Sequence, residues 1–207
     1  FCGVNLYGSW SRERFNIVGD LGYSANRNEV KQELPTTMRL GQLRADVGTG
    51  VLTAGLRGEY RFETDWADVT PHVGVRYYNL HTDGFTSRID DHDVFRVGRD
   101  TQEFWAFPIG VSLSRDFETS SGWKVKPRAD LSAVPAVGGL KAKTKARVPG
   151  VAASDAIKSR MVDSVAFDGT FGLEMQKDDV SLGLDYGLRA SEHKTGHGVN
   201  VSFTCKF

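Results

Sequence analysis

The sequence lacks any apolar run long enough for a transmembrane helix, which needs about 18 or more such residues. It has only 2 cysteines, Cys2 and Cys205, which are too few for a disulfide framework and lack the spacing of a metal motif. It carries no net charge, because 26 basic side chains balance 26 acidic ones. No overall field therefore favours nucleic acid or an anionic membrane surface, and we expect no nucleic-acid partner.

Motifs of the common enzyme classes are missing as well. The sequence contains no Gly-rich phosphate loop, no Ser nucleophile elbow and no zinc-ligand spacing. We therefore expect no cofactor, no metal ion and no catalytic residue. The first residue is Phe and no signal peptide is present, which predicts that the chain was cut from a longer protein.

The residues that are abundant favour β-strands. The chain has 23 Gly, 12 Phe and 6 Tyr, a mixture that suits short strands and tight turns. Apolar and polar residues alternate with period two over about nine segments, and no segment shows a helical period. In the last segment, Val199, Val201 and Phe203 point to one face, whereas Asn200 and Ser202 point to the other. We expect an all-β fold.

The connections between these segments alternate between short and long. The short ones are Ser11–Arg14, Glu63–Asp68, Glu118–Gly122 and Lys177–Asp179, and the long ones, expected to be loops, are Asn26–Gln42, Thr82–Gln102, Ala136–Asp163 and Ser191–Gly196. Outer-membrane barrels combine short periplasmic turns with long external loops, whereas a soluble sandwich has no reason to sort loop lengths by end. The sequence therefore predicts a transmembrane antiparallel up-and-down β-barrel.

The dimensions of the segments agree with a membrane-spanning sheet. Each apolar row has about five positions, as expected for a strand of roughly 9–11 residues that crosses the hydrocarbon layer. Aromatic residues gather near the expected periplasmic ends, where they predict an interfacial girdle. These residues are Trp10, Tyr60, Phe62, Phe117, Trp123 and Phe207. We expect the long loops to be extracellular and the C-terminus to be periplasmic.

Several stretches resemble the autotransporter β-domain family, the barrel of type V secretion. They are Val69–Phe85 (VTPHVGVRYYNLHTDGF), Phe104–Phe117 (FWAFPIGVSLSRDF), Gly122–Pro135 (GWKVKPRADLSAVP) and Val180–Phe207. The resemblance implies an outer-membrane translocator of a Gram-negative bacterium that secretes and anchors an N-terminal passenger domain. It also implies three partners: the passenger, the barrel assembly machinery, and lipid with lipopolysaccharide.

The same resemblance implies an assembly signal on the last strand. The family pattern places a polar residue, then Gly, then two alternating hydrophobic or aromatic residues, of which the second is C-terminal. Asn200 matches the polar position and Phe207 the last one, with Phe203 and Cys205 between them. Ser202 stands where Gly is usual, and Cys205 where an aromatic residue is usual.

Family members close a twelve-stranded barrel around a linker helix. Because only about nine strands are expected here, the resemblance implies that residues 1–207 lack the first three strands and the helix. We therefore expect the first strand not to pair directly with the last strand.

The polar rows should face the barrel lumen. The residues expected to line it are Arg57, Glu59, Arg76, Lys126, Arg128, Asp130, Asp168, Glu174, Asp185 and Arg189, joined by Arg61, His72, Lys124 and Lys206. They predict either a hydrated channel for an extended passenger or ion pairs that brace the wall, and the two roles are compatible.

Other charged stretches allow rival functions. The run Asp90–Asp93 (DDHD) has cation-binding chemistry, although a solvated loop explains it better. It is also the sole support for the alternative of an outer-membrane barrel enzyme, such as a surface protease. Lys141, Lys143, Lys145 and Arg147 suit contact with lipopolysaccharide or a solvated loop. A soluble β-sandwich that binds a ligand is a third interpretation.

Overall fold

The computed structural model describes residues 2–33, 42–89, 92–147, 149 and 154–205, and these form one antiparallel sheet of 16 strands. Nine runs make the wall, with β8 continued by β9. They are β1 (Cys2–Arg12), β2 (Phe15–Glu33), β3 (Gln42–Tyr60), β5 (Asp68–Thr82), β8 (Asp100–Ala106) with β9 (Ile109–Ser114), β11 (Lys124–Gly138), β14 (Val165–Lys177), β15 (Val180–Ser191) and β16 (Thr195–Cys205). The expected all-β, antiparallel barrel-type fold is confirmed.

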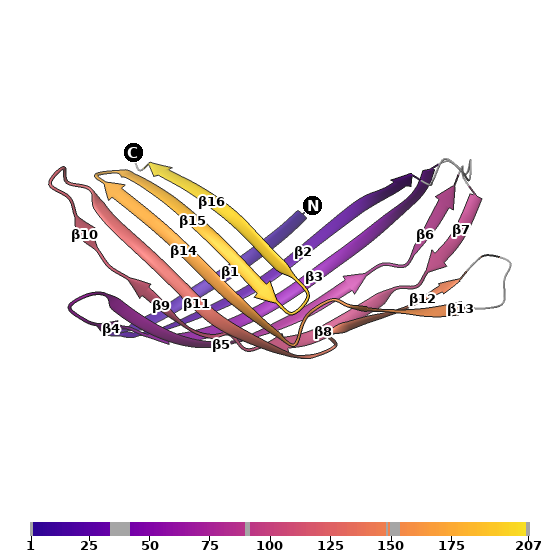
Figure 1. The fold of residues 1–207 in the computed structure, drawn as a ribbon, viewed down its shortest axis with the longest axis horizontal. Helices are drawn as coiled ribbons and strands as arrows, with labels where there is room; N and C mark the ends of the chain where they lie inside the picture. The colour runs from indigo at the N-terminus through magenta and orange to yellow at the C-terminus, as the bar shows by residue number, and fades with distance from the viewer. Residues whose placement is uncertain (1, 34–41, 90–91, 148, 150–153, 206–207) are drawn as a thin grey trace.

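The sheet is strongly curved, and its two ends differ (Figure 1). Short turns lie at one end, on the left of the view, and include the small strands β4 (Phe62–Glu63) and β10 (Phe117–Glu118). We call this the short-turn end. Glu13 and Asp178 adopt positive φ angles of 54° and 50° there, because two-residue hairpins need left-handed backbone to match the strand twist.

The opposite end, here called the long-hairpin end, corrects the expectation of loops. Within Thr82–Gln102 the chain forms β6 (Phe85–Ile89) and β7 (His92–Val97), and within Ala136–Asp163 it forms β12 (Lys141–Arg147) and β13 (Ser154–Arg160). β2 and β3 likewise remain paired as far as Glu33 and Gln42. The loop prediction was wrong because strands that are wetted on both faces need no apolar alternation, which was the signal used to find strands.

The wall of the sheet has two edges within the described residues, apart from the hairpin strand β13, which pairs with β12 alone. There β1 pairs with β2 alone and β16 with β15 alone, so the first and last wall strands share no ladder. None of the described residues belongs to a helix long and apolar enough to cross a membrane.

The packing of the sheet is unlike that of a soluble domain. The buried cluster is small, consisting of Phe104, Ala106, Val134, Ala136 and Ala166. Large apolar side chains are instead exposed on the convex face, among them Phe167 at 61%, Leu184 at 50% and Val201 at 72%. In water-soluble proteins, large apolar side chains are mostly buried, so this exposed face needs an apolar environment such as lipid.

Candidate functional site: the inward face of the sheet

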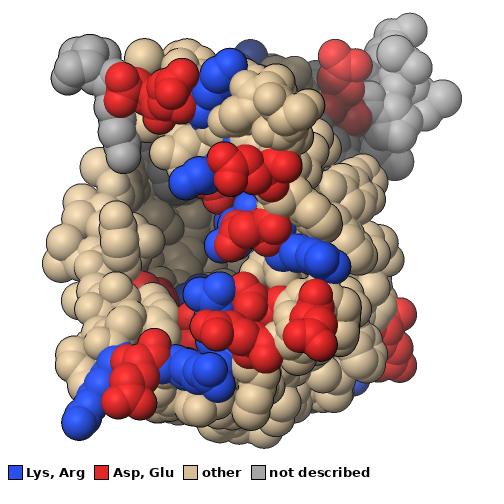
Figure 2. Space-filling view, turned by 90° about the vertical axis from the view of Figure 1, so that its left-hand side faces the viewer, with Lys and Arg blue, Asp and Glu red and all other residues tan. Residues whose placement is uncertain are grey.

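The two faces of each wall strand follow the alternation in the sequence. In β15, Leu182, Leu184 and Tyr186 are exposed on the outer face. Their neighbours across the ladder in β16 are also apolar, since Leu182 pairs with Phe203 and Leu184 with Val201. The polar rows therefore share the inward face. Seen from the short-turn end, acidic and basic side chains gather beside a hollow (Figure 2).

A bidentate ion pair on this face joins β11 to β15. Arg128 donates to both carboxylate oxygens of Asp185, with Nη2 2.7 Å from Oδ1 and 2.8 Å from Oδ2. The two strands are not neighbours, because β14 lies between them and places Gly172 opposite both residues. A Cβ atom on Gly172 would approach Arg128 Nε to 2.6 Å. Glycine is therefore needed for the pair to cross the middle strand.

The same arrangement recurs on the first strands. Arg76 of β5 pairs with Asp20 of β2 across β3, where Gly55 lies opposite both. A Cβ atom on Gly55 would lie 2.6 Å from Asp20 Oδ1 and 2.9 Å from Arg76 Nε. Each pair thus ties three strands together. We call the two units, Arg128–Gly172–Asp185 and Asp20–Gly55–Arg76, the three-strand bridges.

Between the two bridges, Asp130 is the centre of a larger network. Its carboxylate accepts hydrogen bonds from Ser112 and, at 3.0 Å, from Ser132. Arg57 Nη2 lies 3.4 Å from Oδ2, and the buried His72 places Nε2 3.0 Å from the same oxygen. Arg57 also reaches Glu59 of the same strand, β3, at 3.1 Å, and Glu59 accepts a hydrogen bond from Asn16 of β2 at 2.8 Å. Arg57 and the two serines thus satisfy Asp130, whereas neither ring nitrogen of the buried His72 makes a hydrogen bond of normal geometry.

The remaining residues expected in the lumen share the inward face but take part in fewer contacts. Arg189 lies 3.5 Å from Asp168, and Lys126 lies 3.6 Å from Asp116 at the short-turn end. Glu174 lies opposite Lys126 in the β11–β14 ladder, but no ion pair within 4 Å joins these two residues. Of the ten residues expected to line the lumen, nine take part in ion pairs and Glu174 does not, as the wall-bracing interpretation predicts for most of them.

Asp20 and Ser112 complete these networks. The alternation of the sequence places Ser112 on the lumen side, as the structure does, but sequence reasoning missed Asp20. Asp20 stands at an inward position between the outward positions of Gly19 and Leu21, so parity could have assigned it to this face. Their partners could not have been named, because Asp20 and Arg76 are 56 residues apart in the chain.

The expected assembly signal lies mostly within β16. Asn200 is opposite Asp185 on the inward face, whereas Phe203 is opposite Leu182 and is 67% exposed on the outer face. Cys205 is exposed and pairs with Val180. Phe207 and Lys206 lie outside the described residues.

The described aromatic residues of the expected girdle lie beside the short turns, and these are Trp10, Tyr60, Phe62, Phe117 and Trp123. Trp10 contacts Phe15 edge to face at 6.3 Å between ring centroids, and Tyr60 contacts Phe62 at 4.8 Å. Trp10 is 54% exposed. Such exposed aromatic rings at one level of a sheet are typical of a membrane interface.

The acidic run DDHD gives no cation site among the described residues. Asp93 lies 3.0 Å from Arg88 Nε and 2.9 Å from Arg96 Nη2, and its pKa is lowered by the hydrogen bonds from Arg96 and then Arg88. Asp90 and Asp91 lie outside the described residues. The basic residues Lys141 and Lys145 are exposed on β12.

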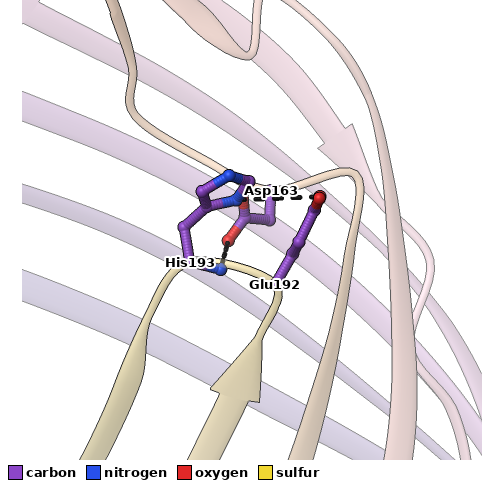
Figure 3. Close-up of side chains that lie close together, drawn as sticks. All are labelled: Asp163, Glu192 and His193. Atoms are coloured by element: carbon purple, nitrogen blue, oxygen red, sulfur yellow. Dashed lines mark hydrogen bonds and ion pairs between the residues drawn. The ribbon is translucent and has the colours of Figure 1, made fainter.

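Asp163, Glu192 and His193 instead converge near the long-hairpin end (Figure 3). Asp163 is buried and accepts hydrogen bonds from Ser191 Oγ at 2.7 Å and from the backbone and ring nitrogens of His193 at 3.0 Å and 2.9 Å. The Ser191 bond is the main cause that lowers the pKa of Asp163 to about 2. Arg160 lies within 3.8 Å of Asp163 and 3.3 Å of Glu192.

These contacts form a clasp and not an evident metal centre. Both carboxylate oxygens of Asp163 already face protein donors, and Arg160 supplies the positive charge that a cation would bring. The clasp fastens the segment before β14 to the turn between β15 and β16. We refer to Asp163, Ser191 and His193 as the clasp below.

The sequence profile of the autotransporter β-domain matches residues 2–187. The chain belongs to this family. A search of curated proteins gave no significant match. An autotransporter β-domain is the outer-membrane translocator barrel of a linked passenger domain and is not itself a catalyst. The resemblance noted from Val69–Phe85 and the later stretches is thus confirmed, as is the assignment to type V secretion.

Proposed function

We propose that this autotransporter β-domain supports secretion of an N-terminal passenger through its lumen and then anchors it at the cell surface. The observation that carries the proposal is the division between the two faces. The outer face exposes apolar side chains that only lipid can cover, whereas the inward face holds paired charges. A wall with this division gives a polar path through an apolar layer.

In this proposal the residues expected to line the lumen act as wall bracing within the path. Arg57, Arg76 and Arg128 are held by carboxylates of other wall strands. Because each cation is neutralised at close range, the inward face presents a hydrated surface with little net charge. A passing polypeptide is then neither held nor repelled by an excess of charge of one sign on the wall.

The proposed orientation puts the short-turn end and the C-terminus in the periplasm and the long hairpins outside the cell. The aromatic rings near the short turns and the polar hairpins β6–β7 and β12–β13 support this choice. By family resemblance, the barrel assembly machinery reads β16, and lipopolysaccharide faces the outer leaflet.

The expected incompleteness of the barrel remains a prediction. Two unpaired edges, β1 and β16, would be costly in lipid because their backbone groups lack partners. We propose that further strands of the complete protein cover both edges. Disulfide trapping between cysteines placed on β1 and β16 in the complete protein should then fail.

Protease treatment of intact cells that produce the complete precursor tests this function. Trypsin should remove the passenger from the cell surface and cut the β12–β13 hairpin, which exposes Lys141 and Lys145. The matched control is Lys177, at the turn between β14 and β15 on the short-turn end of the sheet. Trypsin should cut there only after the outer membrane is opened. Cutting at Lys177 but not at Lys145 in intact cells would invert the orientation, and a passenger that stays inside would refute the secretion role.

A further inference from the structure

Four arginines gather on one face of the strands that project past the wall at the long-hairpin end (Figure 1). They are Arg44 of β3, Arg88 of β6, Arg96 of β7 and Arg147 of β12, and all four side chains are exposed. Arg88 lies opposite Arg44 in one ladder, and Arg147 lies opposite Arg96 in another. Asp93 joins the two pairs, because it contacts both Arg88 and Arg96. We call these four arginines the arginine face.

The arginine face continues the side of the wall that lipid covers. Arg44 and Leu52 are an even number of residues apart in a ladder with β2 whose register is unbroken, so both side chains point outward. Leu52 is exposed and is the last large apolar residue of its outer row. Arg44 lies eight residues from it, which is about 26 Å along the strand. With a strand tilt of about 45°, Arg44 lies roughly 18 Å further from the membrane centre than Leu52.

The arginine face lacks the charge balance of the inward face. Its four guanidinium groups share one carboxylate among the described residues, since Asp93 lies 3.0 Å from Arg88 and 2.9 Å from Arg96. Within the same part of the chain, neither Arg44 nor Arg147 has a carboxylate within 4 Å. Like charges that lie directly opposite each other destabilise a ladder. Both pairs of opposed arginines therefore favour a bound anion between their strands.

Two further carboxylates share the outer face but lie nearer the membrane. Glu29 and Asp46 are opposite each other in the β2–β3 ladder, between the level of Arg44 and that of Leu52. Lys31 lies 3.0 Å from Glu29, and no ion pair within 4 Å joins Asp46 to the described arginines. An anion close to the hydrocarbon layer therefore meets acidic side chains, whereas an anion farther out meets guanidinium groups.

This order of charges selects among the lipids of an outer membrane. The headgroup region of a phospholipid leaflet is only about 5–7 Å deep, so its phosphates lie below the arginine face. Lipopolysaccharide carries further phosphate groups on its core sugars, outside the level of the headgroups. Arginine suits such groups, because its planar guanidinium can bind phosphate through two parallel hydrogen bonds. Core phosphates thus match the arginine face in height, in charge and in hydrogen-bond geometry.

We propose that the arginine face binds phosphate groups on the core sugars of lipopolysaccharide, with Arg96 and Arg147 at its centre. This inference rests on the proposed function, in which the long hairpins lie outside the cell. It goes beyond the contact with lipopolysaccharide that any barrel in the outer leaflet makes, because it assigns four side chains and one class of phosphate. Phosphates bound there offset the repulsion between the opposed arginines and connect the hairpin β6–β7 to the hairpin β12–β13.

Lipid binding to the complete protein in detergent tests the site. Fluorescent lipopolysaccharide with a phosphorylated core is compared with lipopolysaccharide that lacks the core phosphates but retains those of its lipid anchor. The unmodified protein should bind the first form with an at least fivefold lower apparent Kd. Arg147→Gln should lower this preference at least twofold, and Arg96→Gln combined with Arg147→Gln should abolish it. The matched control is Arg12→Gln, which removes an exposed arginine from the outer row at the short-turn end and should keep the preference.

Equal binding of the two lipopolysaccharides by the unmodified protein overturns the site, and this comparison decides even where a variant does not fold. An equal effect of Arg12→Gln and Arg147→Gln also overturns it. So does competition by phosphatidylglycerol that is as effective as competition by lipopolysaccharide, because the arginines then form a general anionic-lipid surface. Surface exposure of the passenger is measured separately in cells. A passenger at the surface without a preference for core phosphates rejects this site alone, whereas a preference with the passenger retained inside rejects the secretion role alone.

Discussion

Arg128 of β11 donates three hydrogen bonds to Asp185 of β15, over a strand that places a glycine between them. The pair joins strands that have no direct ladder in common. Asp20 and Arg76 repeat the arrangement over Gly55. In each bridge the ion pair thus needs the glycine that it crosses. Substitution of that glycine therefore tests the ion pair between the two flanking strands.

Gly172→Ala should lower the stability of the refolded barrel by about 1–3 kcal/mol, the usual cost of overpacking. The new Cβ atom would lie 2.6 Å from Arg128 Nε and would displace the guanidinium from Asp185. Gly187→Ala is the matched control in the adjacent strand, because a Cβ atom there meets nothing within 4 Å. Urea unfolding in detergent measures both. Equal stability of the two variants would show that the bridge does not need its glycine.

A positive charge should be tolerated on one face of β15 and rejected on the other. Leu184→Arg places the charge on the outer face, at a cost of roughly 2–4 kcal/mol near the middle of the bilayer, and should block membrane assembly. Gly187→Arg puts the same charge on the inward face, where there is space. Heat-modifiable migration of outer-membrane fractions reports assembly. Comparable assembly of both variants would contradict the assignment of the faces.

The clasp should open in acid. The pKa of Asp163 is lowered to about 2 in the folded protein, whereas an unfolded Asp titrates near 3.9. The stabilisation by the carboxylate is therefore complete above about pH 4 and is lost as the pH falls through 2. Hydrogen exchange of the His193 amide, which donates to Asp163, should lose protection in this window. The Leu184 amide in the β15 ladder is the control, and in Asp163→Asn the His193 amide should show no such pH step.

Deleting Phe207 should impair assembly in cells more than stability. In the alternation of the sequence, the residue follows Val201 and Phe203 in the apolar row, and by family resemblance the assembly machinery reads it. Burial of one Phe is worth only about 1.5–3 kcal/mol, too little to decide whether a whole barrel folds. The amount of folded barrel in cells should fall sharply while refolding into detergent stays largely intact. If the deletion lowers cellular assembly and refolding into detergent by the same small factor, the recognition role of Phe207 is rejected.

The sequence by itself determined the fold class and the two faces of the wall. Alternation is a local property, so Leu184 and Asp185 are assigned to opposite faces by their neighbours in the chain alone. The short turns at Glu13 and Asp178 could be placed for the same reason, because each connects strands that are adjacent in sequence. The lumen candidates from Arg57 to Arg189 also follow from parity.

Only the tertiary structure decided which of these residues meet. The Arg128–Asp185 pair depends on the register of β11 and β15 on either side of β14, and the clasp joins Asp163 to His193 across 30 residues of chain. The strands β6, β7, β12 and β13 were missed because both of their faces can be wet, which removes the alternation that predicts strands. The apolar cluster around Phe104, against which Tyr78 packs on the inward face, was missed for the opposite reason. Inward residues were expected to be polar, but once several strands converge, their side chains can cover one another and exclude water without lipid.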